Sequence, residues 1–310
     1  MPNKMTTRRK SELSLWLVAI VWGTGFVGTK FAMDAGLSPS CVLMLRFGVA
    51  TLTLWIIFRK HIRATLDRIH VRSGVFVGVF LFLGFMLQTI GMKYTTPANN
   101  AFITATNVVM VPFLWWFLIK KRPGWQTFLS TFLCFVGVAI LSVDFSGGFS
   151  VSPGDLLTLL SAFFYAAQIV LTGRLVLSLD ATTLLFLQLG TTTVLSAVSF
   201  LLFDHDFSSL LSLSGIAAVV YMGIFCTCLC YFWQTHAQQY VPPAETSVIL
   251  ACESLFGTLY SILLGYDPLS VNIVLGGLII FVAVLLPDLL TRKHPPAQEQ
   301  EAAAEAAGEP

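Results

Sequence analysis

Gln88–Ile103 reads QTIGMKYTTPANNAFI, and the chain contains nearly the same stretch again at Gln234–Ile249, QTHAQQYVPPAETSVI. Six of the sixteen aligned positions are identical, where roughly one match is expected by chance at ordinary residue frequencies. Because the two copies lie 146 residues apart in a chain of 310 residues, each half of the chain is a copy of the other. A repeat of this kind must be settled before a fold is assigned.

The composition is that of a membrane protein. Hydrophobic residues make up 56% of the chain and charged residues 11%, whereas a soluble domain carries about 25% charge. The net charge of +2 gives no indication of a nucleic-acid partner, and we expect none. All six cysteines fall inside apolar runs, so we expect buried free thiols, no disulfides and no metal site.

Ten apolar runs of about 20 residues follow one another along the chain, and each is long enough to cross ~30 Å of hydrocarbon. The first run lacks a small-residue cleavage site, which indicates a retained span rather than a signal peptide. The sequence therefore predicts an all-α integral membrane protein. Its predicted transmembrane helices lie near residues 13–33, 40–58, 73–92, 97–118, 125–143, 155–175, 181–202, 214–235, 243–264 and 270–290.

These spans divide into two repeats of five helices each. Five is an odd number, so the second repeat enters the membrane from the opposite side. The result is an inverted-topology repeat around a central cavity, a plan that many secondary transporters share. The predicted units are an N-terminal tail (1–12), a first repeat (13–143), an external linker (144–154), a second repeat (155–290) and a disordered tail (291–310).

The basic residues predict the orientation of the chain. Fifteen of the 18 Lys and Arg residues fall in the tails and loops of one side, or at the end of a span there. The opposite loops carry mainly aspartates, with Lys93 as their one basic residue. Because positive charge marks the cytoplasmic side, we expect a multi-pass protein of the cell inner membrane with both tails in the cytoplasm.

Polar residues inside the spans are candidates for function, because burying them in lipid is costly. Glu253 lies ten residues after Pro243, a rise of about 15 Å that brings it near the midplane. Thr246 lies on the same helix face. Asn100 and Asn107 occupy the repeat positions of Thr246 and Glu253, which predicts two polar stripes facing each other. The alternative for Glu253 is a protonated hydrogen-bond donor in helix packing.

Other polar and aromatic residues fall at similar depth in the predicted spans. Arg46 either clamps a carboxylate or phosphate of the substrate or pairs with an acidic residue or helix end to hold the fold. Gln88 and Gln234 either gate the path or cap the helices that follow. Trp22 and Tyr165 either line the pocket or, as aromatic residues at helical spacing often do, only pack between helices. The predicted substrate-binding set is Trp22, Arg46, Gln88, Asn100, Asn107, Tyr165, Gln168, Gln234, Thr246 and Glu253.

The stretch Gly23–Gly28, GTGFVG, matches the dinucleotide-binding fingerprint. That motif requires a preceding strand and a βαβ unit, whereas this copy lies inside a predicted span. We interpret these glycines as positions that let helices approach closely or leave room for a ligand. No cofactor is expected.

Three segments carry a family resemblance. WGTGFVGTKFAM at Trp22–Met33 resembles the first-span signature of the drug/metabolite transporter superfamily, in its EamA-type branch. LRFGVATL at Leu45–Leu52 resembles the second span of that family, and ANNAFITATNVVMVPFLWWF at Ala98–Phe117 resembles its fourth. Across about residues 13–290, this resemblance implies ten helices, a central cavity, and transport, often export, of small polar metabolites such as amino acids. Glu253 matches no general motif of the family.

The leading functional hypothesis is a secondary transporter that works by alternating access, as a monomer in the lipid bilayer. No nucleotide-binding loop is visible, so transport would be downhill, by exchange, or coupled to protons through Glu253. An intramembrane enzyme would need a clustered acid/base or metal constellation, and a channel would need a charge ring or a selectivity filter. The histidines are spread along the sequence, at His61, His70, His205, His236 and His294.

Overall fold

The computed structural model describes residues 4–120, 122, 124–141, 143–144, 148–149, 152–204 and 212–291. The predicted tail beyond Thr291 lies outside these ranges, and so do residues 145–147 and 150–151 of the predicted linker 144–154. Within them nearly the whole chain is helical. Two short strands, β1 (Val143–Asp144) and β2 (Gly148–Phe149), pair antiparallel.

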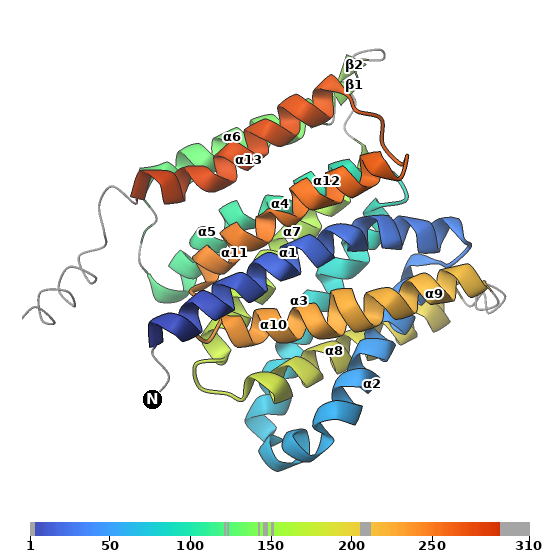
Figure 1. Ribbon diagram of the computed structural model, residues 1–310, viewed down its shortest axis with the longest axis vertical. Helices are drawn as coiled ribbons and strands as arrows, with labels where there is room; N and C mark the ends of the chain where they lie inside the picture. Colours follow the sequence, from blue (N-terminus) through green and yellow to red (C-terminus); the bar gives the residue numbers. More distant parts are fainter. Residues whose placement is uncertain are drawn as a thin grey trace, which may run out of the picture.

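The helices follow the predicted spans closely (Figure 1). In the first half they are α1 (Lys4–Asp34), α2 (Pro39–Thr65), α3 (Arg68–Gly91), α4 (Pro97–Ala105), α5 (Asn107–Ile119) and α6 (Trp125–Leu141). In the second half they are α7 (Pro153–Leu175), α8 (Ala181–Ser199), the π-helix η1 (Phe200–Asp204), α9 (Leu213–Tyr221), the π-helix η3 (Met222–Leu229), α10 (Cys230–Ala237), α11 (Pro243–Ala251), α12 (Glu253–Leu263) and α13 (Val271–Thr291).

Several helices begin with the same short signal, a capping side chain followed by proline. Ser38 precedes Pro39 at the start of α2, and its side chain accepts a hydrogen bond from a backbone N–H of the first turn. Thr96 caps α4 before Pro97 in the same way. Proline suits this position because its missing N–H has no partner in a first turn. The repeated Pro97 and Pro243 thus both mark helix starts.

Eight helical segments of the described chain are long and apolar enough to cross a membrane, and Val271–Ala283 is a shorter apolar helix. The eight segments contain the first four predicted spans and the sixth to ninth. The last span of each predicted half corresponds to α6, of 17 residues, and to α13. The prediction of an all-α, multi-pass membrane protein is therefore confirmed.

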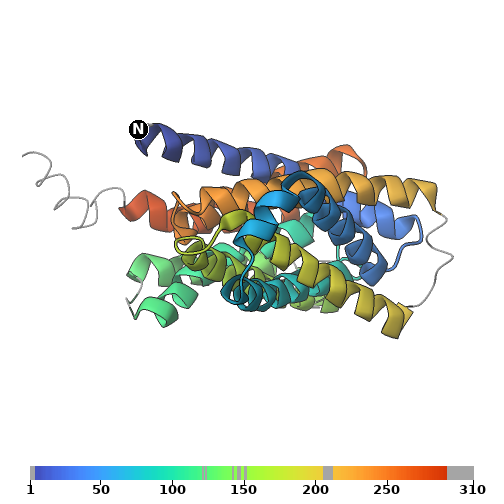
Figure 2. The ribbon, with the colours of Figure 1, turned by 90° about the horizontal axis from the view of Figure 1, so that it is seen from below.

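The two halves interlock instead of forming separate bodies. Helix α3 packs along α7, and α9 and α10 pack in the same way along α1. Helix α2 lies against α8, and α6 lies beside α13 at one edge, where the two run in opposite directions (Figure 1). The start of α1 and the end of α13 lie at the same end of the molecule (Figure 2). Each of these contacts joins one half to the other.

Two helices are broken at equivalent positions of the repeat. The α4–α5 pair breaks at Thr106 (φ −62°, ψ −12°) and the α11–α12 pair at Cys252 (φ −63°, ψ −13°). These two residues are 146 positions apart, the same offset as the sequence repeat. Asn107 and Glu253 therefore each begin a half-helix, where backbone N–H groups lack partners of the regular helical kind.

Glycines allow close helix contacts at several positions, one of them in the GTGFVG stretch. A Cβ atom at Gly23 would lie 2.6 Å from the Cβ of Phe256 on α12. One at Gly74 would lie 2.4 Å from the Cβ of Leu187 on α8. At Gly25 the nearest atoms would be 3.9 Å away, one of them a guanidinium nitrogen of Arg46. The GTGFVG stretch thus serves helix packing at Gly23 and leaves space at Gly25.

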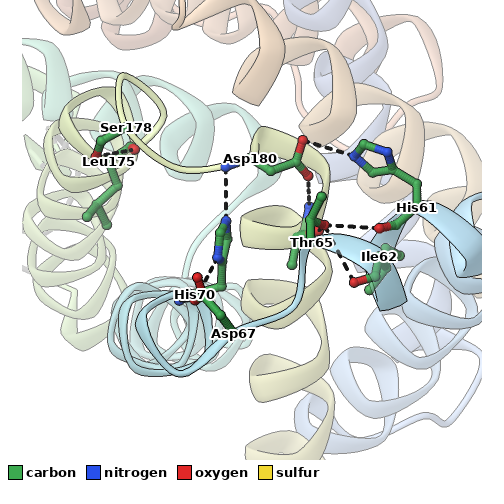
Figure 3. Close-up of polar contacts among 9 residues, drawn as sticks. His61, Ile62, Thr65, Asp67, His70, Leu175, Ser178 and Asp180 are labelled. Carbon is green, nitrogen blue, oxygen red and sulfur yellow. Dashed lines mark hydrogen bonds and ion pairs between the residues drawn. The ribbon is translucent and has the colours of Figure 1, made fainter.

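Two histidines, His61 near the end of α2 and His70 near the start of α3, both contact the distant residue Asp180 (Figure 3). His61 Nε2 lies 2.9 Å from Asp180 Oδ2, and the Asp180 N–H donates to His70 Nε2 at 3.0 Å. Asp67 Oδ1 accepts from His70 Nδ1 at 2.9 Å. The contact joins the end of α2 and the start of α3, in the first half, to Asp180 at the start of α8 in the second. In the part of the chain that the structure describes, no group of three or more His, Cys, Asp or Glu side chains is arranged to hold a metal ion.

Candidate functional site

A cavity lies where the two halves meet. Its volume, measured as the space open to the centres of water molecules, is about 60 Å³, whereas a single water needs ~10–15 Å³ by that measure. Both halves supply its walls, through α1 to α5 and through α7, α10, α11 and α12. Eight of the ten predicted substrate-binding residues line it: Trp22, Arg46, Gln88, Asn107, Tyr165, Gln168, Gln234 and Glu253.

Five aromatic rings line the cavity, and four of them follow the symmetry of the repeat. The ring centroids of Trp22 and Tyr231 are 5.1 Å apart, and those of Tyr165 and Phe85 are also 5.1 Å apart. Trp22 is the repeat counterpart of Tyr165, and Phe85 is the counterpart of Tyr231. Contacts between Phe85 and Tyr231 connect the two pairs at 6.2 Å. The sequence prediction omitted Phe85 and Tyr231, although each lies three residues before a repeated glutamine.

Arg46 is buried, with 5% of its surface exposed. The hydrogen bond that holds its side chain is made by Nε, the nitrogen nearest the aliphatic chain. Its Nε donates to Thr227 Oγ1 at 2.6 Å, and its guanidinium lies 4.8 Å from the ring centroid of Phe85. The cation–π contact and the hydroxyl orient the group. No ion pair of the described residues involves Arg46 or Glu253. The terminal nitrogens are thus suited to an anionic ligand group.

The π-helix η3 supplies two of the contacts that shape this wall. Thr227 of η3 accepts from Arg46, and the backbone carbonyl of Cys226 accepts from Trp22 Nε1 at 2.6 Å. A π-helix displaces carbonyls from the regular helical pattern and often occurs at functional sites. Neither contact was predicted, because the residues of η3 read as an ordinary apolar span.

Glu253 and Asn107, which the repeat predicted to face each other, both line the cavity. Each is 7% exposed, and each begins a half-helix after a break. Asn107 Oδ1 has no hydrogen-bond partner within the described chain. A carboxylate at the start of α12 interacts favourably with the positive end of the helix dipole. The two half-helices thus present one acidic and one neutral polar group to the cavity.

The amide side chains around the cavity differ in their hydrogen bonding. Gln88 donates to Thr104 Oγ1 and accepts from the Tyr165 hydroxyl, both at 2.8 Å. Gln168 donates to Gln188 Oε1 at 3.1 Å. These bonds join one helix to another, so Gln88 and Gln168 help to fix the walls of the cavity.

Asn100 and Thr246 do not line the cavity. Asn100 Nδ2 donates to Thr158 Oγ1 at 2.8 Å, and Thr246 Oγ1 donates to the carbonyl of Val241 at 3.3 Å. Both side chains are fully buried between helices. They lie seven residues before Asn107 and Glu253, about two helical turns nearer the start of each broken helix. At that depth the helices are in direct contact with one another.

The chain resembles known proteins over most of its length. The model of the EamA-like transporter family matches residues 9–143 and again residues 152–287. An uncharacterized transporter of Archaeoglobus fulgidus is 30% identical over 282 residues, which cover 91% of this chain and 87% of the relative. The uncharacterized transporter YyaM of Bacillus subtilis is 28% identical over 263 residues, 80% of this chain and 84% of the relative.

A solved crystal structure has the same fold. It aligns with a TM-score of 0.67 at 18% sequence identity and covers 92% of this chain and 98% of its own. At this level of identity the likeness concerns the fold alone.

Proposed function

Because the chain belongs to the EamA-like transporter family, whose model matches it twice, we propose that it is a secondary transporter of a small polar metabolite such as an amino acid. The observation that carries this proposal is a cavity into which both repeats bring polar side chains from equivalent positions. Substrate sites of secondary transporters lie between repeats, beside broken helices. The breaks at Thr106 and Cys252 adjoin this cavity through Asn107 and Glu253.

The proposed arrangement in the membrane has ten spanning helices in two inverted repeats, α1–α6 and α7–α13. The opposite directions of α6 and α13 support it (Figure 1). The protein lies in the cell inner membrane with the start of α1 and the end of α13 on the cytoplasmic side. It acts as a monomer, because one chain forms the whole cavity.

The way the halves meet supports alternating access as the proposed mechanism. One repeat rocks against the other and exposes the cavity to each side in turn. Arg46 binds the carboxylate of the substrate, and the aromatic rings of Trp22 and Tyr231 enclose its apolar part. We propose that the protein exports its substrate from the cell.

Glu253 is the candidate for proton coupling, because it is the acidic residue among those that line the cavity. We expect Glu253→Gln to keep ligand binding and to lose the dependence of transport on a pH gradient. The ligand is first found by a thermal-shift screen of a metabolite panel. Its counterflow is then measured in proteoliposomes with and without the gradient.

The matched control is Glu245→Gln, the same change on the neighbouring helix α11. Glu245 lies outside the cavity and pairs with Arg8 at 2.8 Å, so its variant keeps the gradient dependence of the wild type. If Glu253→Gln also keeps that dependence, Glu253 does not couple protons. If no member of the panel is exchanged by the wild type, the transporter proposal itself fails.

A further inference from the structure

The two repeated glutamines have the same place in the repeat but different neighbours. Gln88 is tied at both ends of its amide, by Thr104 and by Tyr165. The repeat offset assigns Leu250 to the position of Thr104, and the first-span alignment assigns Trp22 to that of Tyr165. Gln234 therefore has a leucine and a tryptophan where Gln88 has two hydroxyl groups.

Neither of these neighbours satisfies the amide of Gln234. Leucine forms no side-chain hydrogen bonds, and the N–H of Trp22 donates to the carbonyl of Cys226 instead. Both Nε2 and Oε1 of Gln234 lack a hydrogen-bond partner in the described part of the chain, although the residue is only 1% exposed. Buried polar groups are normally paired, because an unpaired buried amide destabilises a fold. Gln234 lines the cavity, so its missing partner belongs there.

We propose that Gln234 determines specificity by pairing with a carboxamide group of the transported ligand, and that Gln88 is a positioning residue that holds Tyr165. This inference rests on the proposed transport function. The side chain of glutamine presents a donor and an acceptor side by side. A carboxamide presents the complementary pair, whereas a carboxylate presents acceptors alone and an apolar group leaves both atoms unpaired.

Other groups of the cavity agree with such a ligand. Asn107 Oδ1, a second unpartnered acceptor, suits the N–H₂ end of a carboxamide. The terminal nitrogens of Arg46 suit a carboxylate on the same ligand. The substrate class is therefore a small carboxylate that also carries a primary carboxamide. A buried polar site that binds such a group discriminates strongly against analogues that lack it.

The test compares probes of similar shape. Glutamine and asparagine carry the carboxamide, methionine and leucine replace it by apolar groups, and glutamate and aspartate replace it by a carboxylate. Dissociation constants are measured by titration calorimetry on the purified full-length protein in detergent. We expect glutamine or asparagine to bind the wild type at least tenfold more tightly than its apolar or acidic analogues. Gln234→Leu removes this preference.

A second variant tests the same idea without changing Gln234. Leu250→Thr gives Gln234 a hydroxyl group at the position where Thr104 bonds to Gln88. Gln234 then has a hydrogen-bond partner within the protein, so we expect the preference for carboxamide ligands to fall. Thermal unfolding supplies a separate readout for the two glutamines. Gln88→Leu lowers the unfolding temperature because Tyr165 and Thr104 lose their partner, whereas Gln234→Leu does not lower it.

The outcomes separate this inference from the transport proposal. A folded Gln234→Leu protein with the wild-type preference among probes overturns the inference, and so does a wild type without a carboxamide preference. In either case, exchange of another panel metabolite in proteoliposomes leaves the transport function standing. A wild type that exchanges no metabolite overturns both.

Discussion

Arg46 shows how the residue scale decides between two interpretations that the sequence left open. A buried arginine either holds the fold through an acidic partner or binds a ligand. In the described chain the contacts recorded for its guanidinium are the hydroxyl of Thr227 and the rings of Phe47 and Phe85, and none of these is acidic. A hydroxyl and aromatic rings orient the guanidinium without neutralising its charge. This favours the ligand-binding interpretation, which remains a proposal.

The glycines of the GTGFVG stretch give a prediction at the same scale. We expect Gly23→Ala to lower the stability of the protein, because its Cβ would lie 2.6 Å from the Cβ of Phe256 and 2.9 Å from the backbone N of Gly257. Overpacking of this kind costs about 1–3 kcal/mol. The measurement is the thermal unfolding temperature of the purified protein in detergent.

Gly25→Ala is the control for this prediction. Its nearest neighbours would be 3.9 Å away, and alanine has a higher helix propensity than glycine by up to ~1 kcal/mol. The unfolding temperature of this variant should therefore equal or exceed that of the wild type. Equal loss in both variants would show that the glycines are needed for a reason other than the contact of α1 with α12.

Residue positions could be predicted where the repeat and helical geometry were sufficient. Glu253 and Asn107 were placed opposite each other from a 146-residue offset and a rise per residue, and both line the cavity. Asn100 and Thr246 were predicted from the same helix faces, but both lie outside the cavity. Periodicity gives the face of a helix, whereas the depth at which two helices separate depends on side-chain packing along their whole length.

At the scale of elements, the loops at one end hold the halves together through a charged contact. Burial alone would raise the pKa of Asp180, but hydrogen bonds from Thr183 and His61 together hold it below its ordinary value. Hydrogen bonds from His70 likewise lower the pKa of Asp67. Asp180 belongs to the second half, and His61 belongs to the first. The ionised carboxylate thus links the last turns of α2 to the start of α8.

This contact predicts a dependence of stability on pH. A lowered pKa in the folded state means that Asp180 contributes stability above its unfolded pKa of about 3.9 and loses it as the pH falls through the folded value. We expect Asp180→Asn to unfold at a lower temperature than the wild type at pH 6, with a difference that shrinks below about pH 4. Because the pair is partly exposed, the effect stays below about 1 kcal/mol.

The asparagine variant keeps the side-chain oxygen that accepts from the N–H of Thr183 at 2.9 Å. The comparison therefore isolates the charge from the helix cap. Thermal unfolding across the pH range checks it. Parallel curves for the two proteins from pH 6 to pH 3 would mean that the carboxylate charge of Asp180 contributes nothing to the contact.

Some elements could not have been predicted from local sequence. The breaks at Thr106 and Cys252 contain no proline or glycine, the residues that usually interrupt helices. The π-helix η3 is apolar in sequence apart from Gly223 and Thr227, and nothing in this local pattern marks it as a π-helix. The convergence of His61 and His70 on Asp180 joins positions more than 100 residues apart. None of these features has a signal in the local sequence pattern.

At the scale of the whole molecule, the sixteen-residue repeat correctly indicated a chain built twice from one plan. The family model matches each half separately. In two of the helix pairs that pack across the halves, a helix contacts its own repeat counterpart. These pairs are α2 with α8 and α6 with α13. A cavity formed in this way changes its shape whenever one half moves against the other.

The most direct test of alternating access is to link the halves at the end of α3 where α7 begins. There the Ser152 hydroxyl donates to the carbonyl of Tyr94 at 2.6 Å. A protein with Tyr94→Cys and Ser152→Cys is joined by a short cleavable bis-maleimide, and counterflow of the screened ligand is measured in proteoliposomes. The single variants treated with the same reagent are the controls. We predict that the linked protein stops exchange and regains it on cleavage, and continued exchange at the wild-type rate by fully linked protein would contradict the account.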